Sequence, residues 1–401
     1  MKNVVFWKLT LALAIAITVS YIIILAGIPA YGHPEDSEER GPVDSSDATA
    51  KLLSLGYLSH ARESHDRGVG VTVYDRVSAY DGLNLFTNLW TSEVLLMDMN
   101  GSVRHTWTLD GRYWHHAVED NMSLVGLAYR VVDGDVEGSI VRMDKGSNII
   151  WKSPGTYHHG VWVTDDGRVY SIDGSKTMPG ERRNITVGGR GYMIVDNHIV
   201  ELSPSGEVVD SVSVFDLVED LVNNETMAEY GDYLPFEAVE VLHTNYVEEV
   251  REDLGYANEG DVLFCVRNLD LIGIADMDEE KLVWHWGPGV LEHPHSPSIL
   301  DGGNILVFDN GVRRGYSRVL ELDPRTGEVV WEYEGSPPES FYSESRGWAQ
   351  RLPNNNTLIT ESDMSRVFEV TREGRIVWEY WNTHADDENR TAIICSMQRI
   401  G

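Results

Sequence analysis

The sequence predicts an all-β fold, a six-bladed β-propeller, preceded by an N-terminal transmembrane helix. Three observations predict this arrangement. One strand–turn–strand hairpin occurs six times along the chain. The chain contains 12 Trp and 18 Tyr, and aromatic side chains favour strands. Residues 9–30 form an uncharged run, and about 20 apolar residues are enough to cross a bilayer.

The recurring hairpin is an apolar strand, a turn with Asp, Gly or Asn, and a second strand that usually ends in Trp. Only the third copy lacks the Trp. Trp284, Trp331 and Trp378 are 47 residues apart, which is close to the length of one propeller blade. The copies are EVLLMDMNGSVRHTW, SIVRMDKGSNIIW, HIVELSPSGEVVDS, IGIADMDEEKLVW, RVLELDPRTGEVVW and RVFEVTREGRIVW.

A second hairpin precedes each later copy, as in HPHSPSILDGGNILVFDN. Two hairpins in series make one four-stranded blade, with strands A to D from the centre outward. Blade 1 has no convincing A strand between residues 79 and 93, so we expect residues 391–400 to supply it and close the ring. The alternative is a β-sandwich whose turns repeat by coincidence.

Two insertions interrupt the repeat. Residues 174–197 lie between strands B and C of blade 3, and residues 215–238, which look partly helical, lie between blades 3 and 4. In a propeller these two kinds of loop open on the same face. Both insertions are therefore expected over one mouth of the central channel.

The N-terminal region predicts four segments: a cytoplasmic tail (1–8), a transmembrane anchor (9–30), an acidic spacer (31–67) with one helical stretch at residues 48–62, and the propeller (68–401). Lys2 and Lys8 precede the apolar run and acidic residues follow it, which leaves the propeller outside a single-pass cell-membrane anchor. A cleaved signal peptide with a cut near Ala30 is the alternative. Asn-x-Ser/Thr sequons, which permit glycosylation outside the cytoplasm, follow at Asn100, Asn121, Asn184, Asn224, Asn355 and Asn389.

The net charge near −32 argues against a nucleic-acid partner, because phosphate binding needs clustered Lys and Arg. Cys265 and Cys395 are far apart in the sequence, which excludes a CxxC redox pair or a zinc ribbon. Both lie in apolar strand-like runs, so buried free thiols are favoured over a long-range disulfide.

Histidines recur where the A strands are expected to begin, at the same mouth of the channel as the insertions. Alignment of the later turns gives His159 and His295 the same phase, so several imidazoles are expected to converge. The alternative for any single histidine is that it only holds a turn. The histidines are His115 and His116 in blade 2, His158 and His159 in blade 3, His243 in blade 4, and His293 and His295 in blade 5.

Polar and cationic side chains join them at this mouth. Arg267 ends strand B of blade 4, and Asn245 points to the same side as His243 two residues earlier. Arg313, Arg314 and Arg346 lie near the same ends. A pocket of imidazoles and guanidinium groups suits an anion such as a sulfate or phosphate ester. HExxH, P-loop, GxGxxG and GxSxG motifs are absent from the sequence, which disfavours a zinc protease, a nucleotide site and a serine esterase.

Several segments resemble the aryl-sulfate sulfotransferase family of the arylsulfotransferase type. They are YDRVSAYDGLNLFTN, HTN, PHSPSILDGGNILVFDNG, SRVLELDPRTGEVVWEY and AQRLPNNNTLITES. The resemblance runs from about Val71 to the C-terminus and implies a six-bladed propeller without a cofactor. It also implies transfer of a sulfuryl group from an aryl sulfate to a phenol through a sulfohistidine, without a nucleotide donor.

By the family's motifs, His295 resembles the nucleophile, the His-x-Asn pair matches His243 and Asn245, and Arg267 matches the arginine of the next B strand. The blade 3 histidine matches His159 or His158. We therefore expect His295, His243, Arg267 and His159 to be catalytic and Asn245, His158, His116 and Arg346 to bind substrate, with no metal.

Two other functions are compatible with a propeller. One is a non-catalytic, membrane-anchored module that binds an anionic glycan or a protein. The other, a quinone-dependent dehydrogenase, would need a calcium site and more blades than the repeat supplies.

Overall fold

The structure is a computed structural model that describes residue 61 and residues 68–89, 91–119, 121–132, 135–174, 182–230, 238–384 and 391–401. The expected tail, anchor and most of the spacer lie outside these residues, as does the expected helical stretch at residues 48–62, apart from Ala61. Among the described helices, none is long and apolar enough to cross a bilayer.

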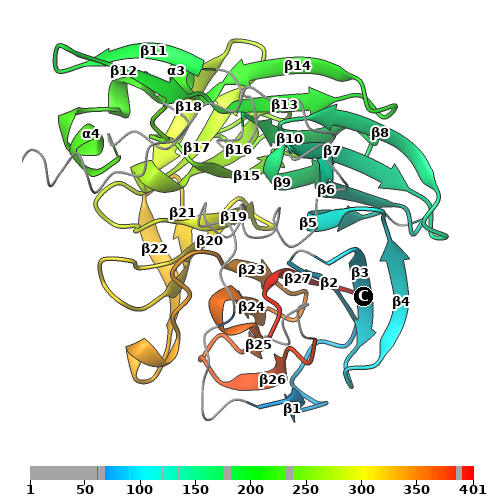
Figure 1. The fold of residues 1–401 in the computed structure, drawn as a ribbon. Helices are drawn as coiled ribbons and strands as arrows, with labels where there is room; N and C mark the ends of the chain where they lie inside the picture. Colours follow the sequence, from blue (N-terminus) through cyan, green and yellow to red (C-terminus); the bar gives the residue numbers. More distant parts are fainter. Residues whose placement is uncertain are drawn as a thin grey trace, which may run out of the picture. The chain divides into compact units, whose positions relative to one another are not determined.

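Six antiparallel sheets form the blades of a propeller, as predicted (Figure 1). The innermost strands β27, β5, β9, β15, β19 and β23 lie nearest the centre of the ring in Figure 1. Blade 1 is β27 (Ile394–Ile400), β2 (Leu83–Asn88), β3 (Glu93–Asp98) and β4 (Val103–Thr108). Blade 2 is β5 (Arg112–Val118), β6 (Leu124–Val132), β7 (Asp135–Met143) and β8 (Ile149–Gly155). Blade 3 is β9 (His158–Val163), β10 (Val169–Asp173), β13 (His198–Leu202) and β14 (Val208–Ser213).

The remaining blades follow the same order. Blade 4 is β15 (Thr244–Glu249), β16 (Val262–Val266), β17 (Leu271–Asp276) and β18 (Lys281–Trp286). Blade 5 is β19 (His295–Ile299), β20 (Ile305–Asp309), β21 (Arg318–Asp323) and β22 (Glu328–Glu334). Blade 6 is β23 (Trp348–Arg351), β24 (Thr357–Glu361), β25 (Arg366–Val370) and β26 (Ile376–Trp381), with β1 (Gly70–Tyr74) as an additional outer strand. The hairpin repeat does not predict β1. Short 3₁₀ turns lie at Arg267–Leu269 (η2), Pro338–Ser340 (η3) and Ser362–Met364 (η4).

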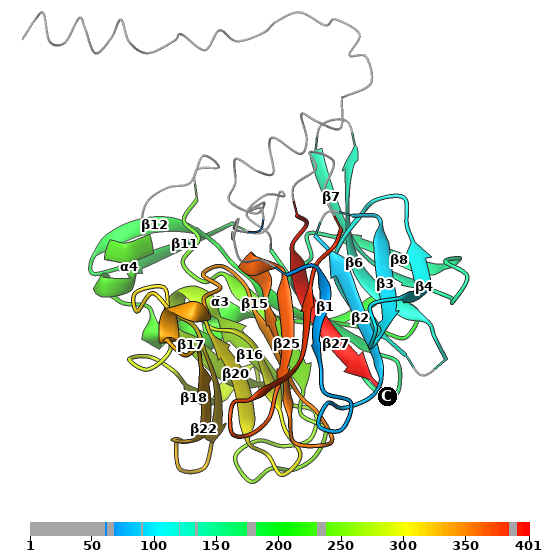
Figure 2. The same ribbon diagram turned by 90° about the horizontal axis from the view of Figure 1, so that it is seen from below.

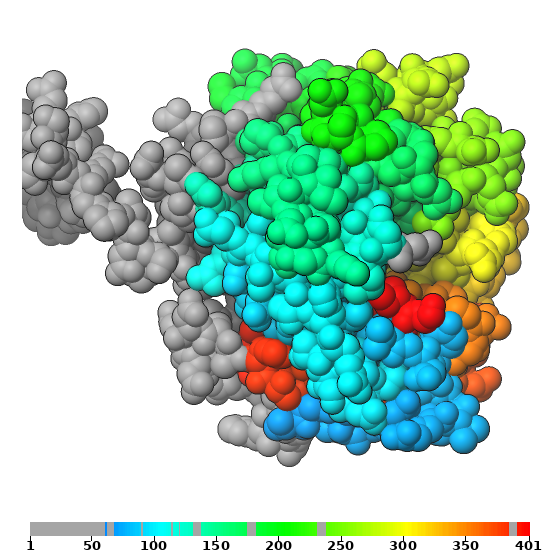
Figure 3. All heavy atoms as spheres, turned by 90° about the vertical axis from the view of Figure 1, so that its right-hand side faces the viewer, coloured from blue at the N-terminus to red at the C-terminus, as the bar shows by residue number. Residues whose placement is uncertain are grey.

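The C-terminal strand closes the ring, as predicted. β27 pairs with β2 from Leu83↔Ile400 to Asn88↔Ile394, so the end of the chain supplies the innermost strand of the first blade. In Figure 3 the C-terminal residues (red) emerge between blue residues from the start of the propeller and orange residues of blade 6. The Arg399 side chain is fully buried and pairs with the equally buried Glu369 of blade 6. Its Nε donates to Asn84 Oδ1 at 2.8 Å, which ties blade 6 to blade 1 through the closing strand.

The Trp of the repeat has a structural role between blades. In four of the five copies that have a Trp, the indole Nε1 donates to a backbone carbonyl in the outer turn of the next blade. The four such bonds are Trp151 to Pro204 at 2.9 Å, Trp284 to Pro324 at 3.2 Å, Trp331 to Arg372 at 2.8 Å and Trp378 to Met99 at 3.0 Å. Trp107 Nε1 of blade 1 is the exception, because it is buried without a hydrogen-bond partner among the described residues. Blade 3 has no Trp at this position, so its junction with blade 4 is held in another way.

Both insertions fold at that junction. The first forms the hairpin β11 (Arg182–Val187) and β12 (Arg190–Val195), and the second forms α3 (Val214–Val218), the 3₁₀ turn η1 (Glu219–Leu221) and α4 (Asn224–Tyr230). Ile194 and Val239 pair as an isolated bridge, and apolar residues of both insertions share one core with blade 4. Figure 2 shows β11, β12 and α4 together at one end of the blades, as the sequence predicted.

Candidate active site

The histidines of blades 3, 4 and 5 lie where the innermost strands begin. His159, His243 and His293 have positive φ angles of 60°, 54° and 54°. A left-handed backbone is uncommon for residues other than glycine, and such strained positions cluster at functional sites. The same local conformation in three blades turns these side chains out of the regular strand pattern.

Irregular pairing at these strand starts decides which histidines are equivalent. His158 of β9 lies opposite Ile172, with a register shift directly after it. His295 of β19 lies opposite Phe308, again with a register shift after it. Both partners are the second-last residues of their strands, so His158 occupies the position of His295. The prediction that His159 shares the phase of His295 is therefore wrong by one residue, because a bulge adds a residue that alternation does not show.

His295 is 6% exposed, and the hydrogen bonds of its ring fix its tautomer. Its Nδ1 lies 2.8 Å from Asn310 Oδ1 and 3.1 Å from the His293 carbonyl oxygen. The Asn310 amide nitrogen donates to the carbonyls of Ser343 and Arg346 at 2.7 and 2.9 Å, which leaves only its oxygen for the histidine. Both neighbours of Nδ1 are acceptors, so Nδ1 carries the proton and Nε2 carries the lone pair.

The surroundings of His295 keep the ring neutral. Burial lowers its pKa well below the usual value, and the charges of Arg267 and His243 lower it further. Nε2 makes no hydrogen bond with the part of the chain that the structure describes. A neutral imidazole with a free nitrogen beside a cation can act as a nucleophile towards an anionic substrate.

The turn before His295 is held from several sides. The Pro294 carbonyl accepts from Asn245 Nδ2 at 2.9 Å and from the Cys265 thiol at 3.2 Å. His293 donates its backbone N–H to Asp270 at 2.7 Å. Its ring Nε2 lies 2.6 Å from the Tyr230 hydroxyl of α4. The second insertion therefore contacts the residue whose carbonyl binds the His295 ring.

Three further imidazoles lie in contact at the junction of blades 3 and 4. The His159 ring is 4.9 Å from the His158 ring and 4.9 Å from the His243 ring, centroid to centroid. Burial lowers the pKa of His159 well below the usual value, and His243, His158, His295 and Arg346 lower it further. His243 Nδ1 lies 3.1 Å from Glu240 Oε2. A carboxylate on Nδ1 orients an imidazole and stabilises it when its other nitrogen takes a proton.

Arg267 and Arg346 supply positive charge to this group. Burial lowers the pKa of the Arg267 guanidinium, but an arginine stays charged in proteins. The Arg267 backbone N–H donates to the His243 carbonyl at 3.2 Å, and its guanidinium donates to Asn268 Oδ1 at 2.8 Å. Arg346 acts electrostatically on both His159 and Arg267. The structure thus brings together His295, His243, His159, His158, Asn245, Arg267 and Arg346.

Comparison with known proteins decides the family. The sequence profile of the family described as Arylsulfotransferase (ASST) matches residues 126–383. The chain belongs to the arylsulfotransferase (ASST) family. No curated protein sequence matches the chain.

One solved structure supports the fold of this arylsulfotransferase-family chain, and a second is reported only as a weaker likeness. A protein of unknown function from Bacteroides caccae is 11% identical with a TM-score of 0.52, over 79% of this chain and 98% of that one. A virginiamycin B lyase from Staphylococcus aureus is 11% identical with a TM-score of 0.44, over 81% of this chain and 88% of that one.

His116 does not lie with the histidines and arginines of the candidate active site in this arylsulfotransferase-family chain. It lies in the second half of β5, fully buried, and burial lowers its pKa to about 3. Its immediate neighbour is His115, whose ring lies 5.4 Å from the Trp348 ring. Because β5 begins at Arg112, His116 lies further along the strand than the histidines that start β9 and β19.

The other residues noted in the sequence either form ion pairs or are buried. Arg314 pairs with the buried Asp309, and Arg313 pairs with Asp270 and with Glu229 of α4. Cys265 and Cys395 are buried free thiols, as favoured from the sequence. Within the described residues, no three His, Cys, Asp or Glu side chains are arranged to hold a metal ion.

Sequence reasoning missed three residues that orient the histidines of the arylsulfotransferase-family site: Asn310, Glu240 and Tyr230. Asn310 stands in the segment NILVFDN that carries the family resemblance, directly after β20, and this position was the available signal. Glu240 precedes His243 by three residues in a segment without regular structure. Tyr230 lies 63 residues from His293, a pairing that no local pattern predicts.

Proposed function

We propose that this chain is a nucleotide-independent aryl-sulfate sulfotransferase that transfers a sulfuryl group to a phenol through His295. The observation that carries the proposal is the His295 ring. It is buried and neutral, its Nδ1 proton is held by Asn310, and Nε2 is left with a lone pair beside Arg267. Family membership supplies the reaction class.

In the first half-reaction, the lone pair of His295 Nε2 attacks the sulfur of an aryl sulfate. An N–S bond forms, the S–O bond to the aryl group breaks, and the phenolate leaves with the electron pair. Arg267 donates N–H groups to sulfuryl oxygens that do not react, and Arg346 adds positive charge nearby. The leaving phenolate takes a proton from a nearby acid.

We assign that acid to His243. Its Nδ1 faces the Glu240 carboxylate, so its Nε2 can hold and release a proton while the carboxylate stabilises the charged ring. In the second half-reaction, His243 takes the proton of the acceptor phenol, and the phenol oxygen attacks the sulfur. The N–S bond breaks, and the electron pair returns to His295 Nε2. The donor and acceptor never need to be bound together, which predicts ping-pong kinetics.

The expected anchor and location are part of the proposal. Residues 9–30 would hold the propeller at the outer side of the cell membrane, where it would meet small aryl sulfates and phenols. Sequencing the mature N-terminus tests this point. A first residue near Gly32 would replace the anchor with a cleaved signal peptide.

One assay tests the activity. The purified chain is mixed with a chromogenic aryl sulfate in the absence of nucleotide, with and without a phenol. We expect continuous release of the donor phenol only when the acceptor is present, together with formation of the acceptor's sulfate ester. Binding of the aryl sulfate without transfer under any of these conditions would favour the non-catalytic binding module.

A further inference from the structure

The sequons share a structural property that is not part of the proposed reaction. Five of the six lie in the described residues, at Asn100, Asn121, Asn184, Asn224 and Asn355, and all five asparagines are exposed. The described chain holds 13 other asparagines, of which only four are exposed and eight are buried. Exposure is therefore not the general condition of asparagine in this protein.

Exposure matters because an N-linked oligosaccharide is bulky and hydrophilic and must project into solvent from the folded protein. A glycan on a buried asparagine, such as Asn84 or Asn310, would be incompatible with the packed blades. We propose that Asn100, Asn121, Asn184, Asn224 and Asn355 carry N-linked glycans. The proposal rests on the expected export of the propeller and is independent of its transfer activity.

Three of the proposed sites lie on tight turns at the end of the blades opposite the candidate active site. Asn100 is in the β3–β4 turn of blade 1, Asn121 in the β5–β6 turn of blade 2, and Asn355 in the β23–β24 turn of blade 6. These are consecutive blades around the ring closure. The corresponding turns of blades 3, 4 and 5 contain no sequon, so the glycans would cover one half of this face.

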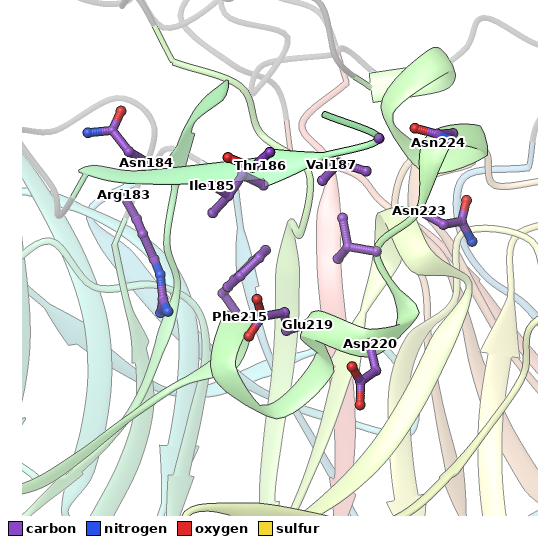
Figure 4. A pocket seen from close by; sticks show the side chains of 12 residues that line it. Arg183, Asn184, Ile185, Thr186, Val187, Phe215, Glu219, Asp220, Asn223 and Asn224 are labelled. Carbon is purple, nitrogen blue, oxygen red and sulfur yellow. The ribbon is translucent and has the colours of Figure 1, made fainter. Parts of the chain in front are cut away.

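The other two sites lie on opposite sides of a groove between the two insertions (Figure 4). Asn184 projects from β11 and Asn224 begins α4. The groove has a volume of about 610 Å³, and its lining includes the buried apolar side chains of Ile185, Phe215 and Val222. None of the histidines of the candidate site lines this groove. Glycans at its edges would flank the mouth of the channel, and none would be attached to a residue of the candidate active site.

The test is glycopeptide mapping by mass spectrometry on the complete chain, produced in a host that exports it and glycosylates Asn-x-Ser/Thr. Export is verified by protease accessibility on intact cells. We expect sugar on all five asparagines and none on the exposed asparagines outside sequons: Asn148, Asn223, Asn258 and Asn354. An exported chain in which all five of these asparagines lack sugar would overturn the proposal.

Two matched pairs of variants separate glycosylation from folding. Thr186 is exposed on β11, so Thr186→Ser keeps the Asn184 sequon and Thr186→Val removes it at little structural cost. Only the valine variant should lose one glycan. Asn224→Gln should lose one glycan, whereas Asn223→Gln should keep it even though Asn223 Oδ1 accepts from Glu225 N at 2.8 Å at the start of α4. Loss in both members of a pair, or in neither, would contradict the assignment.

The sulfotransferase assay on the same samples keeps the two proposals apart. We expect unchanged kcat/KM in Thr186→Val and Asn224→Gln, because neither residue belongs to the candidate site. An inactive but glycosylated chain would contradict the proposed function alone.

Discussion

The junction between blades 6 and 1 and the junction between blades 3 and 4 come from the same repeat but hold their blades together differently. At the first, Trp378 donates to the Met99 carbonyl at 3.0 Å, and Arg399 is fully buried against Glu369. At the second there is no Trp. Two insertions pack across the junction instead, and His159 and His243 face each other at 4.9 Å.

The difference shows how one ring accommodates both stability and chemistry. At the ring closure, the buried charges are paired and hydrogen-bonded, which a buried ion pair needs if it is not to destabilise the fold. At the other junction, His159 and His243 have positive φ angles and burial lowers the pKa of His159, an arrangement that strains the backbone and stabilises the fold little. Packing of the insertions offsets this cost. The following predictions test that division, from the largest expected effect to the smallest.

Arg399→Met should cause the largest loss of stability. It leaves the Glu369 carboxylate buried without its cation, and removing one partner of such a pair costs about 3–5 kcal/mol of unfolding free energy. Denaturant unfolding followed by tryptophan fluorescence measures the loss. The control is Arg104→Met, because Arg104 is 59% exposed beside Asp98 and its loss should cost less than about 1 kcal/mol. Equal losses in both variants would show that the closing pair has no special role.

Arg267→Lys should instead reduce activity while leaving stability nearly unchanged. The charge remains but the planar fork of donors is lost, which should weaken transition-state binding by about 2–4 kcal/mol in kcat/KM. Arg168→Lys is the control, because Arg168 binds Glu201 and Glu249 in blades 3 and 4, away from the histidines. The assignment of Arg267 would be wrong if the two variants had the same kcat/KM.

Tyr230→Phe should have a smaller effect on the reaction. It removes the hydroxyl that lies 2.6 Å from His293 Nε2. The backbone carbonyl of His293 in turn accepts a hydrogen bond from the His295 ring. We expect kcat to fall roughly tenfold, equivalent to about 1.4 kcal/mol, with KM nearly unchanged, because the residue positions the nucleophile. Tyr192→Phe, in the other insertion, should leave kcat unchanged. A lower unfolding temperature with a native kcat would mean that Tyr230 is only structural.

Trp331→Phe should produce the smallest change. The substitution keeps an aromatic ring but removes the Nε1 donor to the Arg372 carbonyl, which links blades 5 and 6. We expect a loss of about 1 kcal/mol of unfolding free energy and no change in transfer. Trp286→Phe removes an indole without such a bond among the described residues. It should cost less, and the reverse order would argue against the Trp as a link between blades.

The sequence predicted the architecture because that information is repeated. Six hairpins, the spare C-terminal strand and both interruptions were visible in the spacing of turns and of residues such as Trp284 and Trp331. The outer strand β1 was not visible, because its five residues belong to no hairpin copy.

The candidate site was predicted in composition but not in register. His295, His243 and Arg267 do converge. However, a bulge makes His158, and not His159, the residue of blade 3 that occupies the position of His295. His116 lies deeper because β5 begins earlier than expected. Partners such as Asn310, Glu240 and Tyr230 depend on how separate segments meet in three dimensions, which strand alternation does not encode.

The central claim is that His295 Nε2 accepts the sulfuryl group, and the mass of the protein after reaction with donor alone tests it most directly. The native chain is incubated with an aryl sulfate without acceptor, quenched in base and mapped by peptide mass spectrometry. We predict one sulfuryl group on the peptide that contains His295, stable in base and lost in acid. Because burial and Arg267 lower the pKa of His295, its nitrogen stays unprotonated, and the adduct should also form below the ordinary histidine pKa of about 6.5.

The matched variant is His295→Asn, whose amide nitrogen can replace Nδ1 as the donor to Asn310 while no nucleophilic nitrogen remains at the position of Nε2. This variant should fold, form no adduct and lose nearly all transfer. An adduct on the His243 peptide, or native transfer by His295→Asn, would contradict the account.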